Sequence, residues 1–276
     1  MDTTLRYESN NGTSVEFAPS KKYHYTGTTL HDYEHQYTVI NNRITGFYDE
    51  VKEFELSVVV AGDSTDDRNI MIEAFEYDVK KLVPGKLWCG DYYLECYVTA
   101  SSKDSWWWED GHMAATLAIA AEHPKWVHEE FKVFGKGKDV DDTGIDYSHD
   151  YSFDYSNNLT VSWANNTGIV PAPFRMRVYG PTDKAVSIII GANSYGIDVI
   201  LAAGDVLTID SRNKTITLKD KSGAETNLFN KRVGQQVQGS GSYIFEGIPS
   251  GKNVVSWAAN YIFDLTVYDE RAEPRW

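Results

Sequence analysis

Apolar and polar residues alternate through most of the second half of the chain. In FRMRVYGP, Phe174, Met176 and Val178 share one face of a predicted strand, and two arginines occupy the other. DVLTIDSRNKTITLKDKSG predicts two strands joined by a turn at 211–214. Strands at intervals of about 8–12 residues, with no helix between them, favour a β-sandwich. NYIFDLTVYDE predicts a last strand with Tyr261, Phe263, Leu265 and Val267 inward and Asp264, Thr266 and Tyr268 outward.

The first half also carries strand patterns, and it contains one predicted helix. Residues 1–60 alternate short polar turns with candidate strands and end in the strand KEFELSVVVAG. In DSTDDRNIMIEAFEYDVKKL, Ile70, Ala74 and Tyr77 recur at helical spacing, and Asp66 or Asp67 is a suitable N-cap. The Pro-Gly pair that follows would end this helix.

The stretch LWCGDYYLECY predicts a hairpin around the two-residue turn Gly90-Asp91. In that register Cys89 faces Tyr92 and Cys96 faces Gly85. The two cysteines are then too far apart along the sheet for a disulfide, which needs Cα atoms within roughly 7 Å. We therefore expect two free thiols in a protein made in a reducing cytosol.

Two further stretches complete the organisation of the chain. MAATLAIAAEHPKW is apolar and is compatible with a strand or a short helix that ends before Pro124. Residues 135–158, GKGKDVDDTGIDYSHDYSFDYSNN, have no period and are the best linker candidate. We therefore predict a mainly β protein with two β-sandwich domains: an N-terminal domain over 1–134 with one helix, and a C-terminal domain over 159–276.

Composition and charge narrow the classes of partner. The net charge is −14, and a chain so acidic repels a phosphate backbone, so we expect no nucleic-acid binding as a main role. No apolar run approaches the roughly 20 residues that span a bilayer, so we expect no membrane association. The start, MDTTLRYESNNG, has neither a basic nor an apolar region, and we expect no signal peptide.

Catalytic patterns are sparse. Adjacent acids such as Glu109-Asp110 point to opposite faces of a strand, whereas a glycosidase needs two facing carboxyl groups about 5–10 Å apart. No G-x-S-x-G motif occurs, and the Gly-rich pieces match neither a phosphate loop nor a dinucleotide fingerprint. We expect no enzyme activity and no cofactor; a β-sandwich glycosidase or lyase remains the enzymatic alternative.

Two stretches resemble metal sites only in part. HDYEH sets His31 and His35 four residues apart, but it lacks the glutamate placement of the zinc-protease helix. DVDDTGIDYSHD, residues 139–150, matches several positions of a calcium loop, yet it ends in Asp instead of Glu and has no flanking helices. We assign no metal ligand, and calcium binding over 139–150 stays open.

The stretch SSKDSWWWEDGHM places Trp106, Trp107 and Trp108 side by side. On a strand, Trp106 and Trp108 face one way and Trp107 the other. The alternatives are a strand buried on both faces, an interface with a subunit or partner, and a sugar-stacking platform. Because exposed indoles together form an apolar patch that a monomer rarely tolerates, we favour a subunit interface at all three tryptophans.

The order of several motifs is similar to that of a known family. The first half contains FEYDVKKLVPGKLWCGDYYLECYVTASSK and HPKW. The second half contains DYSFDYSNN, RVYGPTDKAVSIII, GDVLTIDSRNKTITLKDKSGAETNLFNKR, IPSGKNVVSW and ERAEPRW. Over nearly its whole length, the chain resembles the distal tail proteins of long-tailed, non-contractile bacteriophages and prophages.

This resemblance implies an N-terminal domain related to the tail-tube fold, which assembles into a homo-hexameric ring, and a C-terminal galectin-like β-sandwich. It implies a location at the virion tail tip, with a tail tube protein on one side of the ring and a tail-associated adhesin or lysin protein on the other. Receptor-binding proteins and the tape-measure protein are further candidate partners. The family has no catalytic residues to carry over. Whether the final ERAEPRW packs on the first domain stays open.

A second class of function remains as the alternative. The chain could instead be a carbohydrate-binding β-sandwich module for attachment to the host surface, with tyrosines such as Tyr147, Tyr151 and Tyr155 stacking on sugars. Affinity for cell-wall polysaccharide would distinguish this module from a hub protein, which needs none.

Overall fold

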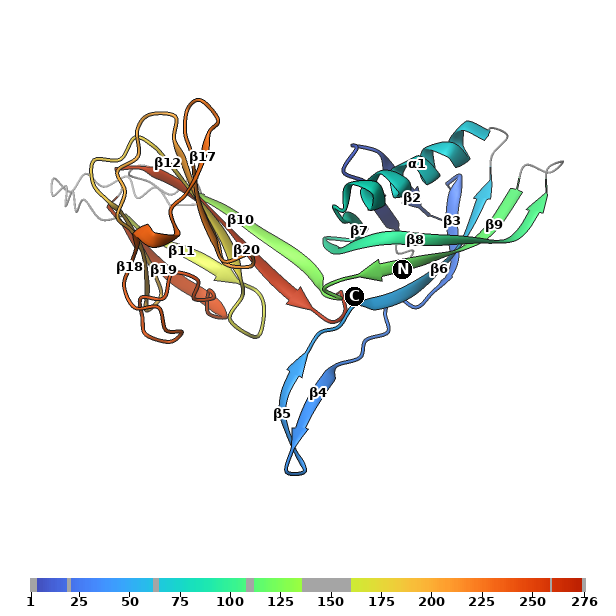
Figure 1. Ribbon diagram of the computed structural model, residues 1–276, viewed down its shortest axis with the longest axis horizontal. Helices are drawn as coiled ribbons and strands as arrows, with labels where there is room; N and C mark the ends of the chain where they lie inside the picture. The colour runs from blue at the N-terminus through green and yellow to red at the C-terminus, as the bar shows by residue number, and fades with distance from the viewer. Residues whose placement is uncertain are drawn as a thin grey trace, which may run out of the picture. The chain divides into compact units, whose positions relative to one another are not determined.

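The computed structural model describes residues 4–18, 21–61, 65–107, 112–135, 160–258 and 260–274. These residues form a mainly β protein with one α-helix, and they divide into two compact units (Figure 1). The first unit comprises residues 1–128 and 270–276, and the second comprises 129–269. Nearly all of the expected linker 135–158, with the calcium-like loop 139–150 and Tyr147, Tyr151 and Tyr155, lies outside the described residues.

The first unit is built on a closed barrel, where we expected a sandwich. Hydrogen-bonded neighbours follow the order β8-β7-β1-β2-β3-β6-β9, and β9 pairs back with β8. The reason is the length of β8, which pairs with β7 through its first residues and with β9 through the rest. Irregularities at 98–100 and 103–105 bend this strand, as β-bulges do, and so help to close the sheet. The strands are β1 (Leu5–Glu8), β2 (Ser14–Phe17), β3 (Tyr23–Thr28), β6 (Lys52–Ala61), β7 (Gly85–Cys89), β8 (Tyr92–Trp107) and β9 (His112–Ala121).

Alternate residues of these strands fill the barrel. The stretch MAATLAIAAEHPKW forms strand β9 followed by a bend, which settles the choice between strand and helix. The inward side chains of β6 and β9 are Phe54, Leu56, Val58, Val60, Met113, Ala115, Leu117, Ile119 and Ala121. The apolar residues that alternate along the predicted strands therefore form the core of the barrel.

The predicted hairpin at Gly90-Asp91 is confirmed. Cys89 opposes Tyr92 and Gly85 opposes Cys96, as the two-residue turn requires. Both cysteines are free and buried, and burial raises the pKa of each thiol. The thiols therefore stay protonated and poorly reactive near neutral pH.

The predicted helix is present as α1 (Thr65–Lys81), but its buried face differs from the expected one. Ile70 and Tyr77 are exposed, whereas Met71, Phe75 and the carboxyl group of Asp78 are buried along with Ala74. The hydrogen bonds of Asp78 cause this difference. Its carboxylate accepts from groups in and just after β1, so the helix buries the face that carries this residue. Among the described residues, no helix is both long and apolar enough to cross a membrane.

The end of α1 is a Schellman motif without glycine. The N–H of Val83 donates to the carbonyl of Asp78, and the N–H of Leu82 donates to the carbonyl of Val79. Leu82 takes the left-handed conformation, with φ 54°, and its side chain points into solvent. The helix therefore ends before the Pro-Gly pair that we expected to stop it.

The second unit contains two sheets that share one core. The first sheet has β12 (Phe174–Tyr179), β15 (Val206–Asp210), β16 (Thr215–Lys219), β17 (Glu225–Asn227) and most of β20 (Ile262–Arg271). The second has β11 (Thr160–Asn166), β13 (Val186–Ile190), β14 (Asn193–Ile197), β18 (Arg232–Val233) and β19 (Gly251–Trp257). A short 3₁₀ helix, η1 (Phe229–Lys231), follows β17. Strand β10 (Trp126–Phe134) carries the chain out of the first unit, and β20 returns it.

The second unit confirms most of the strand predictions. Phe174, Met176 and Val178 lie in the core, and β15 and β16 are joined by the predicted turn at 211–214. The core is aromatic at its centre, where the ring of Phe134 stacks on that of Phe263 with centroids 4.5 Å apart.

Strand β20 corrects one prediction, because it is buried on both faces. The side chains expected inward are buried, but so are Asp264, Thr266 and Tyr268, which we expected to face solvent. Side chains of β12 cover this second face. The Arg177 guanidinium donates from Nε to both oxygens of Asp264 at 3.1 Å, and the Tyr179 hydroxyl donates to the same carboxylate.

Gly85 lies where α1 and the barrel pack closely. A Cβ atom there would lie 2.7 Å from Asp78 Oδ2 and closer still to the Tyr7 hydroxyl, which itself donates to Oδ2 at 2.7 Å. We predict that Gly85→Ala lowers the free energy of unfolding by about 2 kcal/mol, because the backbone or the hydrogen bond must move. Urea denaturation measures it. Gly27→Ala is the control, since a Cβ there meets nothing within 4 Å; equal losses in both variants would contradict the packing argument.

A second prediction concerns alkaline pH. Burial raises the pKa of Tyr261 to about 12, and its hydroxyl donates to the Ser187 carbonyl at 2.8 Å. An unfolded tyrosine ionises near pH 10, so this contribution is complete below about pH 10 and is lost as the pH rises toward 12. Over this range the contribution of Tyr261 to the free energy of unfolding falls by up to about 1.4 kcal/mol per pH unit. Tyr261→Phe should flatten the fall in stability over that range in urea denaturation; an unchanged slope would contradict the assignment.

Candidate functional site: an assembly surface on the first unit

The residues singled out for metal binding do not come together. His31 lies in the loop after β3, where burial lowers its pKa, and the ring of His35 lies against those of Tyr33 and Phe47. Over the described ranges, no group of three or more His, Cys, Asp or Glu side chains could hold a metal ion.

The tryptophan stretch lies partly in strand β8. Trp106 pairs with Met113 and Trp107 pairs with His112 across the β8–β9 ladder, while Trp108 lies outside the described residues. The expectation that a strand of the first domain continues into this stretch is met for the two paired residues. Their place at the far end of β8 puts them on the strand that also forms the groove described next.

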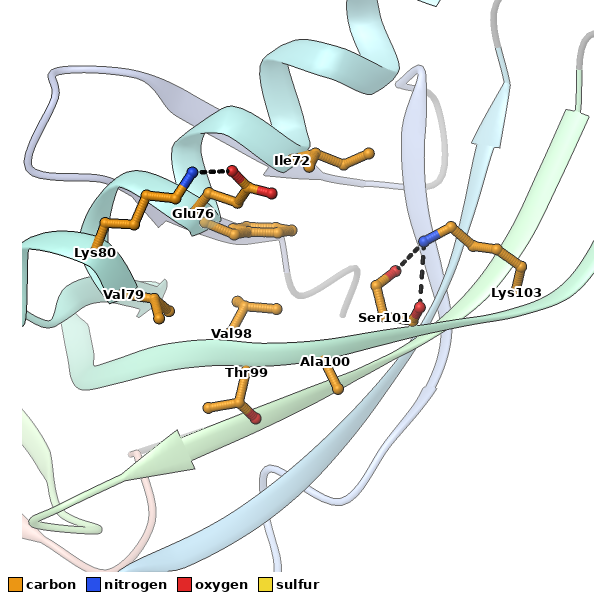
Figure 2. A pocket seen from close by; sticks show the side chains of 10 residues that line it. Ile72, Glu76, Val79, Lys80, Val98, Thr99, Ala100, Ser101 and Lys103 are labelled. Atoms are coloured by element: carbon orange, nitrogen blue, oxygen red, sulfur yellow. Dashed lines mark hydrogen bonds and ion pairs between the residues drawn. The ribbon is translucent and has the colours of Figure 1, made fainter.

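A groove of about 340 Å³ separates α1 from β8 (Figure 2). The walls are mostly apolar. Phe75 of the helix is among the lining residues, and Figure 2 shows Val79 on the helix side and Val98 on the strand side. The full lining is Ile72, Phe75, Glu76, Val79, Lys80, Val98, Thr99, Ala100, Ser101 and Lys103. A concave apolar strip of this kind suits an apolar segment of another chain.

Charged side chains border this strip on both sides. On the helix, Lys80 Nζ lies 2.6 Å from Glu76 Oε2 in an exposed i,i+4 pair. On the strand, Lys103 Nζ donates to Ser101 Oγ at 2.7 Å. Two lysines against one glutamate leave the rim with an excess of positive charge in an otherwise acidic protein.

A second hollow continues the groove past the end of the helix. It shares Val79 and Thr99 with the first and adds the exposed side chain of Leu82. Its lining is Val79, Leu82, Pro84, Tyr97, Thr99 and Glu122. From Ile72 to Leu82, the helix offers a strip about 15 Å long at 1.5 Å per residue.

The first unit also carries an isolated hairpin, β4 (Gln36–Ile40) and β5 (Arg43–Tyr48), which projects from the barrel (Figure 1). It turns at Asn41-Asn42, where both residues have positive φ, as a two-residue hairpin turn of type I′ requires. Among the residues that the structure describes, the two strands form a sheet of their own. Their large side chains face solvent: Tyr37, Val39, Ile40, Ile44, Phe47 and Tyr48 are all exposed.

Neither the groove nor the hairpin was predicted as a site from the sequence. The hairpin had a local signal, because Tyr37 and Val39 alternate with polar residues and an Asn-Asn pair follows. That signal is the same for a strand that faces a core, so only the structure shows that its apolar side is uncovered. The groove joins α1 and β8, and no sequence pattern indicates which side chains would line it.

The barrel with its flanking helix, the projecting hairpin and the two-sheet second unit together give this chain the fold of phage tail hub proteins. The structure matches the Dit hub protein of phage SPP1, with a TM-score of 0.56, 10% sequence identity, and coverage of 98% of this chain and 100% of that chain.

Two structures of the phage P2 baseplate in its activated conformation, with Ca and with Sr, match with TM-scores of 0.59 and 0.58. Both matches are 10% identical and cover 99% of this chain and 100% of the other. No protein-family model and no curated protein matches the sequence. At 10% identity the likeness establishes the fold, and at that level it confirms the resemblance to phage distal tail proteins.

Proposed function

We propose that this chain is a structural hub protein of a phage tail tip. The observation that carries the proposal is the fold match along 98% of this chain and 100% of the SPP1 Dit protein, which is described as a paradigm of the hub of the adsorption apparatus in phages that infect Gram-positive bacteria. A match over the whole chain, and not over one domain alone, favours the same use of both halves.

In this proposal six copies form a ring that joins the tail tube to the adhesion apparatus at the tail tip. The N-terminal domain, 1–134, is the tail-tube-like, ring-forming part, and the domain over 159–276 is a galectin-like sandwich. The tail tube protein and an adhesin or lysin protein bind on opposite sides of the ring, and receptor-binding and tape-measure proteins are further candidates. The groove and the hairpin of the first unit support an assembling role, because uncovered apolar surfaces of this kind mark sites of protein contact.

The tryptophans belong to this proposal as part of the subunit interface. A closed ring needs head-to-tail contacts, in which a patch on one subunit fits a different patch on the next. Large aromatic side chains are the usual anchors of such contacts. Trp106, Trp107 and Trp108 come shortly after Lys103, the last groove residue of β8, in the sequence, which supports a shared role.

The ring is tested by measuring the mass of the purified protein. Light scattering after size exclusion should give six copies of the 31.2 kDa chain, about 190 kDa, and negative-stain images of the same peak should show rings. A monomer that instead binds cell-wall polysaccharide on an affinity gel would contradict the hub and support the carbohydrate-binding alternative.

The tryptophan assignment is tested separately. Trp106→Ala and Trp107→Ala should each abolish or weaken the ring, because each removes a large part of a packed aromatic contact. The loss of one such anchor typically costs about 2 kcal/mol or more of binding free energy. The monomer should keep its far-ultraviolet circular dichroism spectrum and its thermal midpoint. Variants that unfold the monomer while the remaining folded protein still assembles would show that the indoles belong to the core.

A further inference from the structure

Strand β10 lies at the edge of the first sheet of the second unit, beside β20 (Figure 1). Hydrogen-bonded neighbours follow the order β17-β16-β15-β12-β20-β10, and on its other side β10 pairs with β8 of the first unit. That second ladder covers only Trp126 and Val127, because β8 begins at Tyr92. Among the residues that the structure describes, the stretch 129–134 therefore pairs with β20 on one side and has an open edge on the other.

This open edge is longer than two other edges of the same unit. Proteins commonly protect an edge strand by making it very short or by placing a proline or a lysine in it. Strand β17 has three residues and β18 has two, so both of these edges are short. The stretch 129–134, EEFKVF, contains a lysine but neither proline nor glycine. It therefore presents a row of N–H and C=O groups with which an added strand can pair.

The outer face of this stretch is apolar. Phe134 lies in the core of the unit, so Phe131 and Val133 point to the opposite face of the sheet. Their side chains are 56% and 40% exposed. A strand added at the edge would bring its own side chains against both of them. The open edge and the exposed apolar side chains thus occur together, which is typical of a contact site.

The other face of the stretch carries two opposite charges. Glu130 and Lys132 alternate with the exposed pair, so they lie on the same face as Phe134. Glu130 Oε2 accepts from Asn165 Nδ2 at 3.3 Å, and Lys132 Nζ lies 5.6 Å from the centre of the Phe134 ring. A lysine alone would repel its own copy across an edge. Here a glutamate two residues away offers the opposite charge.

These residues are self-complementary in one antiparallel register. When two copies pair about a two-fold axis at Phe131, the residue before Phe131 in one copy opposes the residue after it in the other. Glu130 of each copy then opposes Lys132 of its partner, and the two Phe131 rings meet at the axis. Opposite charges and aromatic pairs in these positions stabilise a ladder. A register centred on Lys132 would instead place two like charges opposite each other, which destabilises it.

We propose that two copies of this chain pair edge to edge through the stretch 129–134 of β10, with the two-fold axis at Phe131. The occupant of the edge is a second copy, because the charges of the stretch complement themselves in this register. The contact goes beyond the proposed ring, since it uses the same patch on both copies and joins them only in pairs. A ladder this short makes a small interface, so pairing should be weak and should increase with protein concentration.

The test is a disulfide across the axis in the full chain. Phe131→Cys places a thiol directly opposite its own copy, within the roughly 7 Å between Cα atoms that a disulfide allows. Val133→Cys is the matched control on the same exposed face. In the proposed register it lies four residues, or about 13 Å along the ladder, from its own copy. The native Cys89 and Cys96 are buried, with raised pKa values, and contribute little background.

Mild oxidation should convert Phe131→Cys into covalent dimers, whereas Val133→Cys should give few. Non-reducing electrophoresis measures the rate, and circular dichroism checks that each variant folds. If Phe131→Cys does not fold, a mixture of Glu129→Cys and Val133→Cys tests the same register, because these positions oppose each other in it.

The charges are tested in the Phe131→Cys chain. Glu130→Lys or Lys132→Glu should each slow dimer formation about tenfold, because two pairs of opposite charges become pairs of like charges. The chain with both substitutions should regain the original rate, since the opposite charges face each other again. Loss of the rate in the double variant as well would overturn the proposed register.

The remaining outcomes separate this inference from the proposed function. Equal rates for Phe131→Cys and Val133→Cys would indicate random collision and would overturn the inference, as would a folded Phe131→Cys chain that gives no dimer. Rings without this disulfide would overturn the edge contact and leave the hub intact. The disulfide without rings would support the edge contact and count against the hexamer.

Discussion

The fold of the first unit depends on one long strand that pairs on both sides. Strand β8 bonds to β7 near its start and to β9 along the rest, and these two ladders close the sheet into a barrel. Without the bend at 98–100, a sixteen-residue strand would run straight past the barrel instead of following its wall. Closure leaves the barrel without free edges, so other surfaces are left to make contacts with partners.

The same strand provides half of the lining of the groove. Its middle residues line the groove against α1, and its end carries Trp106 and Trp107. The helix is held on the barrel by a buried carboxylate: Asp78 accepts from Tyr7 of β1 and from Ser9 and Asn10 just after it, and Gly85 leaves room for this network. Polar contacts therefore anchor the end of the helix whose outer side chains line the groove.

Local features of this protein were predictable from the sequence, and non-local ones were not. The turn at Gly90-Asp91 and the strands β15 and β16 follow from residues within a few positions of one another, and they are confirmed. The prediction of which face of α1 is buried was wrong because Asp78 is held by groups about 70 residues away in the chain. The spacing of apolar residues along a helix does not reveal such partners. Burial of Asp264 likewise depends on Arg177, which lies on the neighbouring strand but 87 residues earlier in the sequence. Barrel closure and the open apolar face of the hairpin are properties of the whole unit.

The central claim is that this chain belongs to the distal end of a phage tail. Immunogold electron microscopy of virions that carry the protein tests it most directly, with an antibody raised against the purified chain. The account predicts gold at the tail tip of intact particles, and none on the capsid or along the tail shaft. Label on the capsid, or particles that lack the protein altogether, would contradict a hub role.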